Sequence, residues 1–162
     1  MHTRTRFVAL LSGMAMLLTG TLALPASAAD ALEVSVTGPV TLTNHILATV
    51  PVKITCSPPQ TTPLYDYVSV QLQQASGQRV NLATGYVLSA SLLTCDGTTV
   101  NTIMVPVTPP PFTNNGPFHG GPAIAQAEVD IEGGISCGIG CTINPFVIEQ
   151  NTSAPTSILL QG

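Results

Sequence analysis

The stretch Val50-Pro-Val-Lys-Ile-Thr-Cys56 decides the fold class, because its side chains alternate in character at every step. Successive side chains of a β-strand point to opposite faces of the sheet, so alternation with period two indicates a half-buried strand. Ser57-Pro58-Pro59 follows and ends the strand. A second run ends in Thr94-Cys95-Asp96-Gly97, and its thiol is the expected partner of Cys56. We therefore expect a β-domain held together by disulfide bonds.

Similar runs recur along the chain at intervals near ten residues, with turn residues between them. The expected strands are 32–37, which continues as 40–43 after a bend, then 50–56, 65–73, 79–82, 86–94, 99–107, 123–131 and 142–150, with 157–161 as a further short edge strand. This pattern predicts a single all-β domain, an immunoglobulin-like β-sandwich of about seven to nine short antiparallel strands. A small β-barrel is the alternative, because periodicity does not separate the two. Ala123, Ala125 and Ala127 on one strand face indicate close approach of another backbone.

Two local signals refine the strand boundaries. Asp96-Gly97 is the strongest hairpin signal of the chain, since a type I′ turn needs positive φ at both central residues. We expect it to join strand 86–94 to strand 99–107. Thr84-Gly85 is expected to end the strand that starts at Arg79.

The N-terminal segment 1–28 has the pattern of a cleaved secretory signal peptide, with basic, apolar and small-residue regions in order. Cleavage is expected after Ala28 or after Ala29. A retained membrane anchor is the alternative, because the apolar run is about long enough to span a bilayer. Serine, threonine and glycine dilute that run, however. We expect residues 29–162 to form one domain that is secreted to the extracellular space.

The charge of the mature chain excludes several classes of partner. Only Lys53 and Arg79 remain as cations against eight acids, so the net charge is 2 − 8 = −6. Two cations cannot form the basic face that nucleic acid or an anionic membrane surface requires. Tryptophan is absent and aromatic residues are few, which disfavours a stacking platform for sugars or bases. The expected partner is therefore an unknown protein, a cell-surface component or a small molecule.

All four cysteines, Cys56, Cys95, Cys137 and Cys141, remain after signal removal, and an exported protein meets an oxidising environment. Four cysteines allow three pairings. The two glycines of Cys137-Gly-Ile-Gly-Cys141 let a tight loop close on itself, and that pairing leaves Cys56 with Cys95. The usual zinc spacings are absent, so we expect structural disulfides and no metal.

No constellation of residues predicts catalysis. A nucleophile–His–acid triad can be assembled on paper from Ser89, His119 and Asp130, but no motif such as Gly-x-Ser-x-Gly supports it. We therefore expect that the protein is not an enzyme and that it has no catalytic residue and no cofactor. Glu128, Asp130 and Glu132 alternate on one strand, about 7 Å apart. We expect them to protect an edge strand from pairing; a calcium site and a hydrolytic carboxylate pair are the alternatives.

The proline-rich segment Thr108–Pro122 is expected to be a long loop without regular structure. Proline-rich chain is preorganised and extended, which suits recognition of a partner. In that interpretation Phe112 and Phe118 are the anchors and His119 lies beside them. The other interpretation is a crossover between sheets whose rings pack on the core, and the sequence leaves both open.

The signal peptide, the strand ending in Cys56, the later Thr94-Cys95-Asp96-Gly97 and the approach Phe118-x-x-Gly-Pro-Ala123 resemble small secreted immunoglobulin-like proteins of actinobacteria. Many of those have no assigned activity. A more distant similarity is to the neocarzinostatin-type apoproteins, which implies a seven-stranded sandwich, two disulfides and an apolar cleft for a chromophore. Their C-terminal disulfide closes a short loop, as Cys137 and Cys141 would. Their other disulfide also spans a short loop, unlike the 39 positions between Cys56 and Cys95.

From the residues we expect a secreted, non-catalytic structural or binding module. The alternative is a small-molecule carrier whose ligand cleft lies between the sheets. An extracellular hydrolase and a protease inhibitor using the proline-rich segment rank below both.

Overall fold

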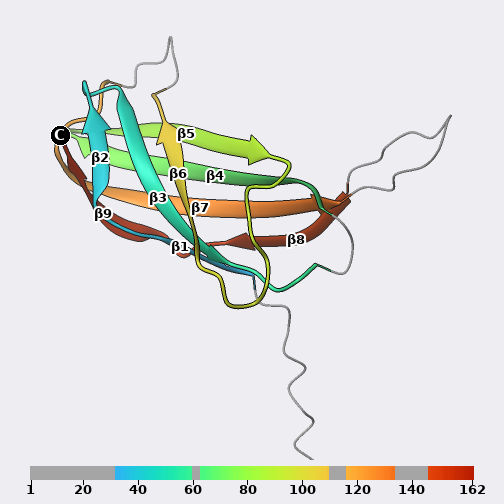
Figure 1. Ribbon diagram of the computed structural model, residues 1–162. Helices are drawn as coiled ribbons and strands as arrows, with labels where there is room; N and C mark the ends of the chain where they lie inside the picture. The colour runs from blue at the N-terminus through green and yellow to red at the C-terminus, as the bar shows by residue number, and fades with distance from the viewer. Residues whose placement is uncertain (1–31, 60–62, 110–115, 134–145) are drawn as a thin grey trace, which may run out of the picture.

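The computed structural model describes residues 32–59, 63–109, 116–133 and 146–162, which form nine β-strands and no helix (Figure 1). Among these residues there is accordingly no helix that could cross a membrane. The signal segment 1–28, Phe112, Cys137 and Cys141 lie outside the described residues. The strands are β1 (Glu33–Val36), β2 (Val40–Thr43), β3 (Leu47–Thr55), β4 (Pro63–Ser76), β5 (Arg79–Ser89), β6 (Asn101–Val107), β7 (Gly121–Gly133), β8 (Phe146–Thr152) and β9 (Thr156–Gln161).

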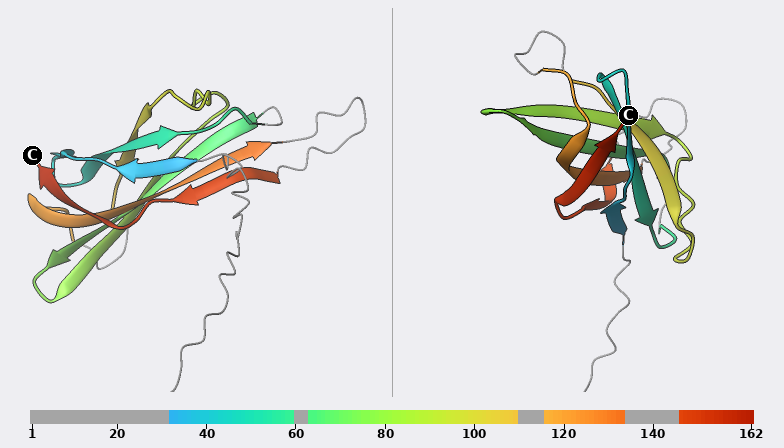
Figure 2. Two further views of the ribbon diagram at one scale, coloured as in Figure 1. Left: turned by 90° about the horizontal axis from the view of Figure 1, so that it is seen from below. Right: turned by 90° about the vertical axis from the view of Figure 1, so that its left-hand side faces the viewer.

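The strands form two layers of a β-sandwich, as predicted. In the first layer β3 lies between β6 and the successive strands β1 and β2. In the second layer β4 lies between β5 and β7, and β7 pairs on its other side with β9 and then β8. Figure 2 shows the β4–β5 hairpin crossing β3 at an angle. The path of paired strands ends at β1 and β5 and does not close, so the barrel alternative is wrong.

Two features of this topology differ from the prediction. The pairing of β2 with β9 is parallel and joins the two layers along one side, whereas we expected antiparallel strands throughout. The last strand, β9, is therefore an interior strand between β2 and β7 and not the short edge that the sequence indicated. The central strands β4 and β7 are also longer than expected, at 14 and 13 residues.

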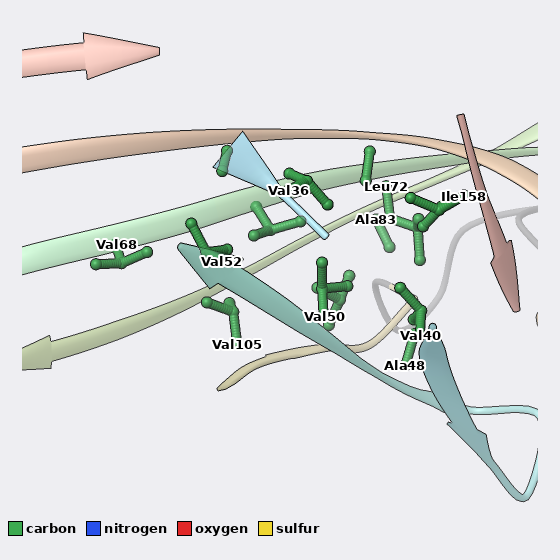
Figure 3. Close-up of a cluster of buried hydrophobic side chains, with 14 of the residues drawn as sticks. Val36, Val40, Ala48, Val50, Val52, Val68, Leu72, Ala83, Val105 and Ile158 are labelled. Atoms are coloured by element: carbon green, nitrogen blue, oxygen red, sulfur yellow. The ribbon is translucent and has the colours of Figure 1, made fainter. Parts of the chain in front are cut away.

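The predicted parity of the deciding stretch is confirmed. Val50, Val52, Ile54 and Cys56 are fully buried between the layers, and Lys53 points out to solvent. Figure 3 shows these valines meeting side chains of the facing layer. The core is made mostly of small and branched residues, and the alanines of β7 are buried within it, also as predicted. Because such side chains are short, the backbones of the two layers approach closely.

The strand β5 runs through Thr84-Gly85, so the expected strand break there is wrong. The glycine serves a close approach of backbones instead. A Cβ built on Gly85 would lie 2.7 Å from the carbonyl carbon of Pro106 and 2.8 Å from the Cα of Val107. At the same place Thr84 forms an isolated bridge with Thr108, which joins the two layers on the side opposite β2. The absent side chain lets β5 lie directly on β6.

The predicted Asp96-Gly97 hairpin is also wrong. Residues 90–100 form an irregular connection that leads from β5 in one layer to β6 in the other. The Asp96 carboxylate accepts hydrogen bonds from the backbone N–H groups of Thr98 and Thr99, at 2.8 and 2.6 Å. This is the local side-chain turn that aspartate forms readily, and it competes with a hairpin for the same residues.

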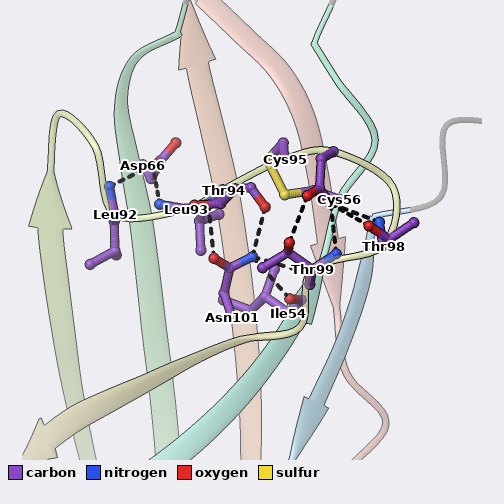
Figure 4. Close-up of a disulfide and its surroundings, with 11 residues drawn as sticks. Ile54, Cys56, Asp66, Leu92, Leu93, Thr94, Cys95, Thr98, Thr99 and Asn101 are labelled. Carbon is purple, nitrogen blue, oxygen red and sulfur yellow. Dashed lines mark hydrogen bonds between the residues drawn. A yellow bond between two sulfur atoms is a disulfide. The ribbon is translucent and has the colours of Figure 1, made fainter.

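The disulfide between Cys56 and Cys95 is present, which confirms the predicted pairing (Figure 4). It attaches the 90–100 connection to the end of β3, and Asn101 bonds the backbone of Thr94 beside it. From the other layer, the buried Asp66 of β4 accepts hydrogen bonds from the N–H groups of Leu92 and Leu93, both at 2.9 Å. The connection thus links both layers at this end of the sandwich.

Candidate functional site

The side chains of β4, β5 and β7 that point away from the core form one continuous surface, which we call the outer face. The strand register aligns these side chains across the three strands. The outer face consists of Tyr65, Tyr67, Ser69, Gln71, Gln73, Ala75, Val80, Leu82, Thr84, Tyr86, Leu88, Ile124, Gln126, Glu128, Asp130 and Glu132.

An apolar stripe runs along β5 on the outer face. Val80, Leu82, Tyr86 and Leu88 are 60%, 41%, 62% and 54% exposed, and Thr84 lies at the middle of the stripe. Large apolar side chains scattered singly on a surface are ordinary, but here four are gathered on one face of one strand. Such a patch is the kind of surface that binds a partner.

Beside the stripe, a shallow groove of about 170 Å³ crosses β5, β4 and β7 and reaches the end of β8. Its lining is polar apart from one alanine, and it is uncharged apart from one carboxylate. It consists of Ser69, Gln71, Thr84, Gln126, Ala127, Glu128 and Thr152. A second hollow of about 300 Å³ lies towards the hairpin tip and is lined by Gln73, Ala75, Val80, Pro122, Ala123, Ile124 and Ser157.

The acidic residues of β7 occupy the other end of the outer face, with the tyrosines of β4. The strand register places Glu132 opposite Tyr65, and Asp130 opposite Tyr67. The pKa of Tyr65 is raised by its hydrogen bond with Glu132, followed by desolvation and the charge of that carboxylate. Because β7 is an interior strand, paired on both sides, the prediction that these acids protect an edge strand is wrong. Within the described residues, no acidic group has the arrangement of a metal site.

Asp130 is the acid whose surroundings most disfavour its charge. Partial burial raises its pKa, the charges of Glu128 and Glu132 raise it further, and a hydrogen bond from Gln150 opposes them. One carboxylate oxygen, Oδ1, is buried and has no hydrogen-bond partner among the described residues. The folded state therefore holds this carboxylate at some cost in stability.

Replacing Asp130 by asparagine is expected to raise the Tm near pH 7 and to have a smaller effect near pH 4. The pKa of Asp130 in the folded state lies above the unfolded value of about 3.9. The contribution of Asp130 to stability therefore falls as the pH rises from the unfolded pKa through the folded pKa. Asparagine does not ionise and removes this loss. Thermal unfolding of both proteins followed by circular dichroism across this pH range measures it, with Glu33→Gln on β1 as the control. An equal Tm for wild type and Asp130→Asn near pH 7 would contradict the assignment.

The three residues of the hypothetical triad do not come together. Ser89 lies at the end of β5, opposite Asp66 of β4. Asp130 of β7 lies on the other side of β4, opposite Tyr67, which is the next residue along β4. His119 is bound through its backbone to Gln74, seven residues along β4 from Tyr67, the partner of Asp130. Seven residues of extended strand span about 23 Å. Nothing in this arrangement joins the three side chains in a proton relay.

The part of the proline-rich segment that the structure describes, 116–120, is fixed to the sandwich. Phe118 is 1% exposed and packs in the core, so it is not an exposed anchor for a partner, and the crossover interpretation holds for this ring. His119 is exposed at the surface. Phe112, the other expected anchor, lies outside the described residues.

Two buried amide side chains hold this segment, and neither was predicted from the sequence. Gln74 of β4 donates to the carbonyl oxygen of His119 at 2.6 Å and accepts from its N–H at 3.0 Å. Asn81 of β5, the cross-strand neighbour of Gln74, bonds in the same way to Gly116 N–H and the Pro117 carbonyl. Each amide thus acts as a short piece of β-ladder. The sequence could have indicated Gln74, because its position in the alternation of β4 is one that points into the core, where a polar side chain requires a hydrogen-bond partner.

Comparison of the sequence with protein-family models gives no match, and comparison with curated protein sequences gives none either.

Proposed function

We infer that this protein is a secreted, non-catalytic binding module that engages an extracellular partner through the outer face of the β5–β4–β7 sheet. The apolar stripe on β5 carries this proposal, because four large apolar side chains lie exposed along one strand and a partner would bury their apolar area. The signal-peptide pattern of segment 1–28 and the Cys56–Cys95 disulfide support export to an oxidising compartment.

The carrier alternative receives less support from the geometry. Its cleft was expected between the two sheets, but the space between them is filled by the buried core (Figure 3). The hollows described above lie on the outer face and are open to solvent. A ligand held there would remain in contact with water, whereas a carrier that sequesters a reactive molecule must enclose it.

The proposal is tested by photo-crosslinking at one position on each sheet. A photoreactive phenylalanine analogue replaces Tyr86 on the outer face or, as the matched control, Met104 on β6, which is 52% exposed. Each protein is irradiated with the culture medium and cell envelope of the organism that makes it. We expect adducts from position 86 and none from position 104.

Equal adducts from both positions, or none from either, would overturn the outer face as the binding surface.

Mass spectrometry of the protein taken from the medium tests export at the same time. The expected mass is that of a chain that begins at Ala29 or Asp30, and two disulfides lower it by about four hydrogens. A chain that keeps residues 1–28 would contradict secretion by a cleaved signal.

A further inference from the structure

We propose that the outer face binds a neutral polysaccharide, whose sugar units lie in the polar groove and in the adjoining hollow. This inference rests on the proposed function and names the chemical class of the partner. Four observations carry it: unused hydrogen-bonding capacity in the groove, the absence of cations from its lining, the tyrosines beside it and the succession of two hollows.

The groove contains hydrogen-bonding groups that the protein does not use. The hydroxyl groups of Ser69, Thr84 and Thr152 make no hydrogen bond to any described residue. The side chain of Ser69 is almost buried, at 8% exposure, and it lines the groove. Gln71 accepts from Gln73 at 3.2 Å, which leaves its own amide N–H groups free among the described residues. Gln71, Thr84 and Thr152 are exposed, so a polyhydroxylated ligand would take the place of water at these groups and would pair the hydroxyl of Ser69.

The charges around the groove select a neutral ligand. The two cations of the described residues lie elsewhere: Lys53 is on the outward side of β3, and Arg79 is at the tip of the β4–β5 hairpin. The carboxylate of Glu128 lines the groove, Asp130 and Glu132 follow further along β7, and these charges repel anions. A sulfated or uronic-acid polysaccharide would therefore bind poorly. Carboxylates accept hydrogen bonds from neutral hydroxyl groups, and amides both accept hydrogen bonds from them and donate to them.

The tyrosines supply the apolar contact that a sugar ring also needs. All three tyrosines of the chain lie on the outer face, although their number in the sequence predicted no stacking platform. Tyr67 and Tyr86 lie next to each other, with ring centroids 5.7 Å apart, and Tyr86 is 62% exposed. The C–H faces of a pyranose pack on exposed aromatic and aliphatic surface while its hydroxyl groups bond sideways. Tyr86 and the adjacent polar groove offer both contacts.

The shape of the face favours a chain of sugars over a single one. The groove, of about 170 Å³, is smaller than the roughly 300–1,000 Å³ of pockets that enclose drug-sized ligands. Gln71 lines the groove and Gln73 lines the next hollow, about 7 Å further along β4. Two small, open hollows in line suit consecutive units of an extended ligand. Many weak contacts along such a ligand add up to useful affinity.

Native affinity electrophoresis tests the inference. The mature protein carries a net charge of −6 and migrates to the anode, and a neutral polysaccharide in the gel slows it only by binding. The probes are a glucan, a mannan, a galactan, an arabinan and a xylan, with polygalacturonate as the anionic control. We expect at least one neutral probe to retard the protein. Thr84→Val and Gln71→Leu should each raise the apparent Kd about tenfold, the loss of one good hydrogen bond.

Thr102→Val is the matched control, because Thr102 is an exposed strand threonine on the outward side of β6. It should bind like the wild type. Retardation by none of the neutral probes, or equal retardation of all variants, would overturn the inference. A protein adduct at position 86 in the crosslinking experiment would then keep the proposed function and replace the sugar by a protein, whereas the absence of both would reject the two proposals together.

Discussion

The double variant Cys56→Ala/Cys95→Ala is expected to lose about 4 kcal/mol of unfolding free energy relative to the wild type. The bond joins residues 39 positions apart, and the chain-entropy estimate for a loop of that length gives this value. Domains are typically stable by only about 5–15 kcal/mol, so the loss is a large fraction of the total. The disulfide also attaches the 90–100 connection to the end of β3, and without it only hydrogen bonds, such as those to Asp66, to Asn101 and to the backbone of residue 56, would hold this connection. Guanidinium unfolding of the two proteins measures the difference.

The matched control is Cys137→Ala/Cys141→Ala, which removes the other expected disulfide. Its residues are only four positions apart, so the same estimate gives about 2 kcal/mol. The wild type under reducing conditions should fall to the stability of the Cys56→Ala/Cys95→Ala variant, or below it. Equal losses for the two double variants would contradict the argument from loop length.

The sequence predicted those parts of the fold that depend on side-chain parity. Alternation in 50–56 and in 123–131 placed the correct side chains in the core, because a strand slipped by one residue would bury its polar face. It did not predict what depends on partners distant in the chain. Thr84-Gly85 is read locally as a break, and only the presence of β6 on β5 explains the glycine. Asp96-Gly97 has the composition of a hairpin, but neighbouring threonines and the disulfide select another turn.

The candidate site was the least predictable part, for the same reason. Tyr65 and Tyr67 lie about twenty residues before Tyr86 and about sixty before the acids of β7, and no local pattern shows that the register of three strands will align them. The expected binding residue Phe118 illustrates the converse. An aromatic ring in a Pro/Gly-rich segment indicates either an exposed anchor or a core contact, and the buried amides of Gln74 and Asn81 decide for the core.

Gly85→Ala is expected to destabilise the protein by about 3 kcal/mol. The added methyl group would meet the backbone of Pro106 and Val107, and backbone within a paired strand cannot move aside as a flexible side chain can. Overpacking of this kind typically costs about 1–3 kcal/mol, and contact with backbone places this variant at the upper end. Thermal and guanidinium unfolding measure the loss. Gly120→Ala is the control, since its added methyl group would come no closer than 3.7 Å to the Leu160 carbonyl oxygen.

The sign of this effect is a strict test of how the two layers meet. In an ordinary strand, alanine is more favourable than glycine by about 0.5–1 kcal/mol, because glycine loses more backbone entropy on folding. If β5 did not lie on β6, Gly85→Ala would therefore be neutral or stabilising. A loss of stability for Gly85→Ala together with a near-zero effect for Gly120→Ala would place the backbone contact at Gly85. A stabilised Gly85→Ala protein would show that the layers are not joined at this point.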